Sequence, residues 1–349
     1  MKKSFLFLFL IILSIFLLYS QPGFTQANYQ QVESVNRVGT TAAQFLKITA
    51  GARPVGMGGA YTALSDDILS VFWNPGGLSR VIGNGEAIFN HSEWLAETDY
   101  DIGAFSLNLG RYGSVGAHIV SFRTPDELVR TVELPEGTGQ TWDANMVSLG
   151  VSYALNLTDR FSIGLTGKYI QEKIFNAVAR GGAVDLGILY DTPLKNLTLG
   201  ASITNFGTKM KMDGRDIFIT HDPVREPGAV DEVPGQYRMD SYDIPLNLRF
   251  GLSYRAIQSE YIQFVAAVDG VQPNDNSEYL NVGAELGVRN IVFLRTGYKS
   301  LFMENSEQGL TFGAGIRYDV VGSSFKFDFG WADYGRLKNV QFVSFAIRY

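Results

Sequence analysis

The chain has no cysteine among its 349 residues and only three histidines, and Lys, Arg, Asp and Glu make up 18% of it, against about 25% in average soluble proteins. Without cysteine there is no disulfide framework, no thiolate metal site and no acylation site after a signal sequence. The histidines, His91, His118 and His221, do not have metal-ligand spacing. With a net charge of -6, the chain lacks the excess of basic residues that is typical of nucleic-acid-binding proteins. After residue 20, no apolar run approaches the roughly 20 residues of a spanning helix.

The amino terminus has the composition of an export signal. Lys2 and Lys3 precede an apolar run that ends at Tyr19, and small or polar residues follow up to Ala27. This order predicts a secretory signal peptide over residues 1–27. An uncleaved membrane helix is the alternative, but the run is too short to span a bilayer. We expect the signal to export the protein without anchoring it.

Glycine and aromatic residues are abundant, at 38 residues and 13% of the chain. Apolar and polar residues alternate over most of the chain after residue 85, for example from Val147 to Leu157 and from Val343 to Tyr349. This period predicts β-strands, which a secreted β-sandwich and an outer-membrane barrel would share. The polar faces carry mainly Gly, Ser, Ala, Thr and Asn, whereas a water-facing surface would carry more Lys and Glu. We therefore predict a crowded polar lumen and a lipid-facing apolar exterior.

The number of segments and the lengths of their connections predict the topology. Residues 85–349 contain about fourteen strands, and short and long connections alternate between them, as in bacterial outer-membrane barrels. The fold prediction is all-β: a transmembrane antiparallel up-and-down β-barrel. Two strands, 99–109 and 260–269, alternate less cleanly, which predicts a bulge or a slipped boundary in each.

Residues 28–84 differ from the barrel and are predicted to form a plug inside it. The stretch 51–60 is too rich in glycine for a strand or a stable helix. Residues 65–67 are predicted to cap and begin a short helix that runs through Phe72 and ends before Pro75. An irregular segment at membrane depth can satisfy its backbone against lumen side chains.

This segment resembles the amino-terminal signature of the PorV/PorQ proteins, which belong with the FadL-type hydrophobic-compound transporters. The resemblance rests on residues 41–48, 51–53, 56–60, 66–67 and 73–78. It implies a fourteen-stranded outer-membrane barrel with an amino-terminal hatch. In place of the Asn-Pro-Ala of many relatives, the chain has Asn-Pro-Gly-Gly. The predicted plug motif consists of Gly51, Arg53, Gly56, Gly58, Gly59, Asp66, Asp67, Trp73, Asn74 and Pro75.

The resemblance implies two alternative functions. PorV-type relatives serve type IX secretion, with the translocon, the sortase or secreted cargo as partners. FadL-type relatives take up fatty acids or other hydrophobic compounds. The loop 207–241 is long and mostly polar, which favours docking of proteins over gripping of an apolar tail. Four apolar residues in or beside it favour uptake: Phe206, Met210, Met212 and Phe218.

Catalytic interpretations have weak support. The stretch 56–59 imitates part of a dinucleotide fingerprint but follows no apolar strand and opens no long helix. Asp66 and Asp67 fit a helix cap better than an acid pair, and His118 with Ser114 lacks an evident triad partner. We predict no enzyme, no cofactor and no metal site.

Several charged residues fall on lumen faces by the alternation rule, and they are expected mainly to pair with one another and with the plug. The alternative is that Lys168 or Arg249 holds a substrate carboxylate. The predicted ligand contacts in the lumen are Lys168, Arg249 and Arg317. The other inward charges are Asp185, Glu285, Arg295, Lys326, Asp328 and Arg348.

Overall fold

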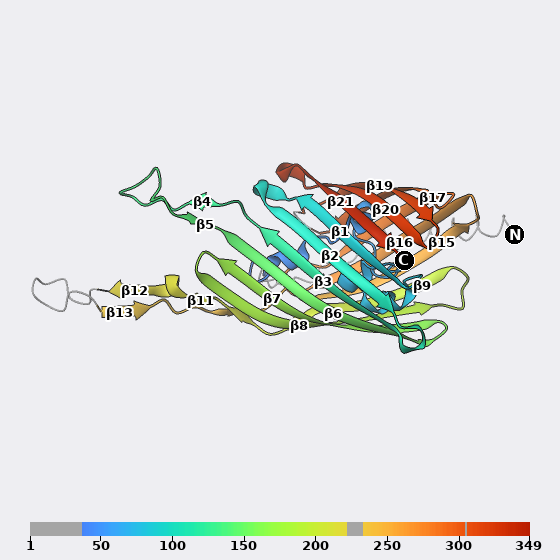
Figure 1. Ribbon diagram of the computed structural model, residues 1–349, viewed down its shortest axis with the longest axis horizontal. Coiled ribbons are helices and arrows are strands. Elements are labelled where there is room, and N and C mark those ends of the chain that lie inside the picture. Colours follow the sequence, from blue (N-terminus) through green and yellow to red (C-terminus); the bar gives the residue numbers. More distant parts are fainter. Residues whose placement is uncertain (1–36, 222–232, 304–305) are drawn as a thin grey trace, which may run out of the picture. The chain divides into compact units, whose positions relative to one another are not determined.

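The computed structural model describes residues 37–221, 233–303 and 306–349, so the predicted signal peptide lies outside the described residues. Within this part of the chain, fourteen long strands form a closed antiparallel barrel in which neighbours in sequence are neighbours in space, and the last strand pairs with the first (Figure 1). The predicted fold class and strand number are confirmed. The barrel strands are β1 (Gly85–Glu93), β2 (Asp99–Asn108), β3 (Ser114–Arg123), β6 (Ala144–Thr158), β7 (Phe161–Ile174), β8 (Ala177–Asp191), β9 (Leu197–Gly207), β15 (Asn247–Gln258), β16 (Ile262–Pro273), β17 (Tyr279–Val288), β18 (Val292–Leu301), β19 (Leu310–Val320), β20 (Ser323–Asp333) and β21 (Asn339–Arg348).

The strands place apolar side chains outside and polar ones inside. On the exterior, Val151 is 68% exposed and Phe250 61%, although both are large and apolar. On the interior, Ser148 and Thr166 are fully buried. Such an inverted distribution suits a barrel whose outer wall contacts lipid instead of water.

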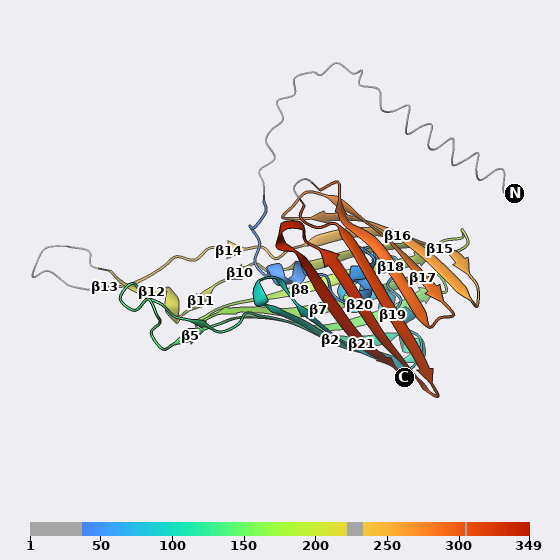
Figure 2. The same ribbon diagram turned by 90° about the horizontal axis from the view of Figure 1, so that it is seen from above.

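Short turns join the strands at one end of the barrel, and longer loops join them at the other (Figures 1 and 2). We call these the short-turn end and the long-loop end; β1 begins and β21 ends at the short-turn end. None of the helices in the described residues has the length and apolar character of a membrane span. The connections contain the 3-10 helices η3 (Leu95–Glu97), η4 (Gly110–Tyr112), η5 (Arg215–Ile217) and η6 (Gly335–Leu337), and the short strands β4 (Glu127–Leu128), β5 (Thr141–Trp142), β10 (Met210–Lys211), β11 (Asp213–Gly214), β12 (Phe218–His221), β13 (Val233–Gln236) and β14 (Ser241–Tyr242).

Strand β2 corrects one prediction. It pairs with β1 and β3 without a shift in register, and it ends within one residue of its predicted bound, so the bulge or slipped boundary predicted for residues 99–109 is wrong. Its alternation is unclear because Tyr100 and Ile102, each 1% exposed, face the lumen and pack there. For residues 260–269 the boundary is slipped, because β16 runs from Ile262 to Pro273. The register between β15 and β16 also shifts, between Arg255 and Ile257 on the partner strand β15.

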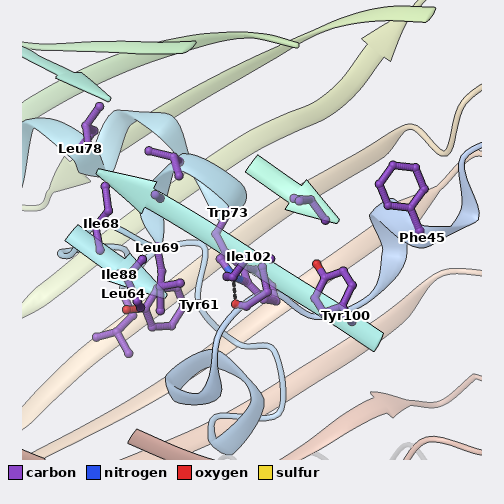
Figure 3. Packing of buried hydrophobic residues seen from close by; sticks show 14 of the residues in the cluster. Phe45, Tyr61, Leu64, Ile68, Leu69, Trp73, Leu78, Ile88, Tyr100 and Ile102 are labelled. Carbon is purple, nitrogen blue, oxygen red and sulfur yellow. Dashed lines mark hydrogen bonds between the residues drawn. The ribbon is translucent and has the colours of Figure 1, made fainter. Parts of the chain in front are cut away.

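The remaining helices lie in residues 41–82, which we call the inner segment. They are η1 (Gln44–Lys47), α2 (Ala52–Gly56), α3 (Ser70–Trp73) and η2 (Pro75–Arg80). Helix α2 contacts strands β18 to β21, and η2 contacts β3 and β6 to β8, so the inner segment touches opposite walls of the lumen. The apolar core lies between them, where side chains such as Tyr61 and Ile68 meet residues of β1 and β2 (Figure 3). The five-residue helix α2 falls in a stretch that was predicted to contain none.

Candidate functional site

Glycines on the lumen face let the backbone of the inner segment approach the strands directly. A Cβ added to Gly58 would lie 2.6 Å from the carbonyl oxygen of Val282 and 2.7 Å from the nitrogen of Tyr298. Gly58 also has a φ of +64°, a conformation that L side chains disfavour. The wall residues that face the inner segment in this way are Gly164, Gly187, Gly200, Gly251, Gly283, Gly297, Gly313 and Gly330.

Arg53 on helix α2 ties the inner segment to the wall. Its Nε and Nη2 each donate a hydrogen bond of 3.0 Å to the carboxylate of Glu285 on β17. Its Nη1 lies 2.8 Å from a carboxylate oxygen of Asp66 and of Asp67. The planar guanidinium suits such a two-pronged contact with one carboxylate while it still reaches others.

The contacts of Arg53 extend into a chain of ion pairs around the lumen. Glu285 also accepts a 2.6 Å hydrogen bond from Arg295, which in turn lies 2.6 Å from Asp328. On the other side, Asp66 lies 3.2 Å from Arg255 on β15. Because several of these charges are buried, the loss of one partner would leave another uncompensated in a confined lumen.

The Asn-Pro step connects α3 to η2, and Asn74 holds it both to the inner segment and to the barrel wall. The side-chain nitrogen Nδ2 of Asn74 donates 2.9 Å hydrogen bonds to the carbonyl oxygens of Thr62 and of Ile188 on β8. Its side-chain oxygen accepts a hydrogen bond from the Gly76 nitrogen, so Asn74 caps η2. Pro75 occupies the first position of this 3-10 helix, where its missing N–H costs nothing.

The helix predicted to begin at residues 65–67 begins later, at Ser70. Asp67 has one local and two more distant partners. One carboxylate oxygen accepts a hydrogen bond from the Leu69 nitrogen, and the other binds Arg53 and the Tyr61 hydroxyl. The local sequence suggested a cap, whereas the arginine thirteen to fourteen residues earlier competes for the same carboxylates.

The other motif residues are structural parts of the inner segment. Gly51 precedes α2 with a φ of +90°, and Gly56 lies against the backbone of Gly313. The carbonyl oxygen of Gly59 accepts a hydrogen bond from Asn281. Trp73 donates a hydrogen bond from its ring nitrogen to the carbonyl oxygen of Ala50.

A cavity of about 60 Å³ lies between the inner segment and the long-loop half of the barrel. Lys168 and Arg249, two of the predicted ligand contacts, both line it, together with Lys299. Lys168 already pairs with Asp185 at 2.6 Å. Arg249 donates a hydrogen bond to Thr204 and lies over the Trp73 ring, with no ion pair among the described residues. The structure thus brings two predicted contacts together around a space that holds only a few waters.

Arg317, the third predicted contact, lines a separate cavity of about 310 Å³ at the short-turn end. The predicted pairing of inward charges holds for most of them, but Arg317 forms no ion pair within the part of the chain that the structure describes. It therefore does not belong to the same site as Lys168 and Arg249.

Sequence reasoning missed three buried acids that bind cations or backbone nitrogens. Asp269 accepts hydrogen bonds from the nitrogens of Tyr61 and Thr62, and Glu86 lies 2.7 Å from Lys326. Asp275, in the loop after β16, binds Lys47 at 2.9 Å. The alternation rule could have placed Asp269 inside the barrel, but no local pattern signals the loop residue.

The comparisons with known proteins bear on this arrangement. The family model described as "Type IX secretion system protein PorV" matches residues 30–221, more than half of the chain, including the inner segment and the strands through β9. The chain belongs to the PorV family. Membership of this family places the barrel in the bacterial outer membrane, with the apolar faces of its strands against lipid. A comparison with curated proteins finds no match.

Solved structures with a similar fold include hydrocarbon channels and transporters. The CymD monoaromatic hydrocarbon channel has a TM-score of 0.51 and 11% identity, and the Pseudomonas putida toluene transporter TodX has 0.51 and 12%. The Ralstonia pickettii toluene transporter TbuX has 0.50 and 14%. Each match covers 85% of this chain and 96% of the other. At these identities the likeness concerns the fold, which the PorV-family barrel shares with FadL-type transporters.

Proposed function

We propose that this barrel serves type IX secretion as an outer-membrane docking protein that receives secreted cargo from the translocon or carries it to the surface sortase. The observation that carries the proposal is the match of residues 30–221 to the PorV family. We further propose that residues 28–84 act as the hatch of the barrel and that residues 1–27 are the export signal. No catalytic step is part of this role.

The close packing of the lumen around Lys168 and Arg249 supports docking over passage. The cavity beside Lys168 and Arg249 measures about 60 Å³, whereas sites for small organic ligands measure roughly 300–1,000 Å³. The inner segment is held by the Arg53 ion pairs and by Asn74, so opening a path requires these contacts to break. A protein that works through its outer surfaces does not need them to break.

The long-loop end offers protein surface that is separate from the barrel wall. Strands β12 and β13 pair with each other, and the described part of the chain gives them no other strand partner. Phe218 is 63% exposed and Tyr237 59%, and exposed aromatic residues suit protein contacts. This hairpin would face outward, because outer-membrane barrels have short periplasmic turns and longer external loops.

Uptake of hydrophobic compounds is the second candidate. It is supported by the fold shared with TodX, TbuX and CymD and by the cations that line the 60 Å³ cavity, among them Lys168 and Arg249. In that function, Lys168 or Arg249 would hold a carboxylate while the inner segment moves aside. Arg249 suits this role better, because Lys168 already has a carboxylate partner at 2.6 Å.

The test is deletion of the gene followed by complementation. The secretion proposal expects that deletion leaves cargo absent from the cell surface, in a strain that encodes cargo with type IX sorting domains. Complementation with the full chain should restore display. Complementation with the R249Q variant should restore it equally well, because the secretion role does not need a carboxylate ligand at Arg249. Normal display in the deletion strain, together with lost uptake of a labelled fatty acid, would transfer the assignment to the transporter.

Deletion of the hairpin formed by β12 and β13 tests the docking role more specifically than deletion of the gene. Replacing residues 218–236 with a short Gly-Ser linker removes β12 and β13 and leaves every barrel strand in place. We expect this variant to insert normally and to lose cargo display. The matched control shortens the other projecting arm, residues 129–140, between β4 and β5; equal loss of display in both variants would indicate general damage to the loops and not a specific docking hairpin.

A further inference from the structure

The cavity at the short-turn end, which we call the basic cavity, has a volume of about 310 Å³. Its rim includes Ile82, which is 69% exposed, and the exposed turn residue Asn290. Its lining is unusually rich in cations: Arg53, Arg80, Arg255, Arg317, Lys326 and Arg348, against the acids Asp66 and Glu285.

One wall of the basic cavity carries more positive charge than the protein neutralises. Arg317, Lys326 and Arg348 lie on the adjacent strands β19, β20 and β21, and Arg317 is directly opposite Lys326 in the register. Glu86 alone serves two of them, at 2.7 Å from Lys326 and 3.4 Å from Arg348. Arg317 has no ion pair within the described ranges. Like charges directly opposite each other destabilise a sheet.

The guanidinium groups also have unused donors. The Nε atoms of Arg317 and Arg348 are buried and have no hydrogen-bond partner among the described residues. Buried donors of this kind are costly and usually find a partner. These two donors come from strands β19 and β21, which flank β20, and both belong to residues that line the basic cavity, so they suit a bound oxyanion.

The opposite wall does not share this excess. Arg53 is satisfied by Asp66, Asp67 and Glu285, and Asp66 also binds Arg255. Arg80, likewise at the cavity, pairs with Asp191 at 2.9 Å. An anion that enters the cavity is therefore drawn to the wall of Arg317, Lys326 and Arg348.

We propose that the basic cavity binds a phosphate group, with Arg317 and Arg348 as its guanidinium ligands and Lys326 beside them. Three cations and the single carboxylate of Glu86 leave two positive charges on this wall. A phosphomonoester carries a charge of about −1.5 to −2 at neutral pH, and the phosphodiester of a phospholipid headgroup carries a single negative charge, so either would be attracted to this wall. Guanidinium donors match two phosphate oxygens at once. The group can come from soluble phosphate or from a phospholipid headgroup in the periplasmic leaflet.

Calorimetric titration of the full mature chain in detergent with inorganic phosphate tests the site. We expect R317Q to bind at least about tenfold more weakly, the loss expected for a charge-assisted contact. R160Q, which removes an exposed arginine from the turn after β6 at the same end of the barrel, should bind like the wild type. Acetate should bind at least tenfold more weakly than phosphate.

Thermal unfolding separates ligand binding from a structural role. Phosphate should raise the melting temperature of the wild type and not that of R317Q. Without phosphate, R317Q should melt no lower than the wild type, because it removes an unpaired cation next to Lys326. A lower melting temperature for R317Q without phosphate would assign Arg317 a structural role and overturn the proposal.

The source of the phosphate is found by mass spectrometry of the protein released from nanodiscs that contain phosphatidylglycerol. Retention of lipid by the wild type and not by R317Q would identify a headgroup; phosphate binding without retained lipid would identify soluble phosphate. Absence of both, or equal binding of acetate and phosphate, would show that the cavity is not a phosphate site.

Discussion

The guanidinium of Arg53 and the carboxylate of Glu285 form two hydrogen bonds of 3.0 Å across the boundary between the inner segment and strand β17. The two residues are 232 positions apart in the chain. Because both ends of the pair are largely buried, this contact fixes where helix α2 sits against the wall and couples it to Arg295.

Replacing Arg53 with glutamine is expected to lower the free energy of unfolding by about 3–5 kcal/mol, because Glu285, Asp66 and Asp67 lose their shared cation. Urea titration of the protein in lipid vesicles measures the change. R53K keeps the charge but loses the planar fork, and it should recover only part of the loss. An R53Q variant as stable as the wild type would mean that the network does not hold the inner segment.

Gly297 is expected to be essential for the fit of the inner segment. A side chain at this position would meet the backbone of Gly58, so G297A should destabilise the packed inner segment by about 1–3 kcal/mol and increase its cleavage by added protease. G167A is the matched control, since a Cβ there has nothing within 4 Å. Equal protease sensitivity in both variants would contradict this close approach.

Asn74 is expected to be the main polar anchor of the step between α3 and η2. N74A removes two donated hydrogen bonds and the cap on Gly76, which should cost about 1–3 kcal/mol. Faster amide exchange in residues 75–80 would be its local signature. N339A, at an exposed position at the start of β21, should leave both quantities unchanged.

The contact between η1 and the loop after β16 should weaken in acid. Burial alone would raise the pKa of the Asp275 carboxyl, but hydrogen bonds from Thr41, Lys47 and Gln44 outweigh it and lower that pKa below its ordinary value. The charged carboxylate is the form that binds, so its stabilisation is complete above the ordinary pKa and is lost as the pH falls through the lowered one. Amide exchange of residues 42–47 should accelerate over that range, and D275N should abolish this pH dependence.

The sequence predicts the barrel wall far better than the interior. Alternation and turn residues are local signals. They predict strands over residues 143–157 and 160–172, and the structure has β6 from Ala144 to Thr158 and β7 from Phe161 to Ile174. The glycine-rich inner segment is also visible locally. By contrast, Tyr100 and Ile102 were mistaken for signs of a bulge because a crowded lumen can accept apolar residues.

The contacts of the candidate site could not be predicted, because they join distant positions. Asp66 and Asp67 look like a helix cap when only their neighbours are considered, and their binding to Arg53 depends on the folded chain. Likewise, the alternation rule placed Arg317 and Arg249 inside, but only the structure separates them into two cavities.

The most direct test of the central claim, that this barrel works with its lumen filled, is cargo display by a variant whose inner segment is locked to the wall. The nitrogen of Ala52 lies 2.9 Å from the hydroxyl of Ser344 on β21, and the chain has no cysteine of its own, so a disulfide between A52C and S344C would form the lock. We predict normal surface display of type IX cargo in the oxidised variant. Loss of display on oxidation that is recovered on reduction would contradict the account.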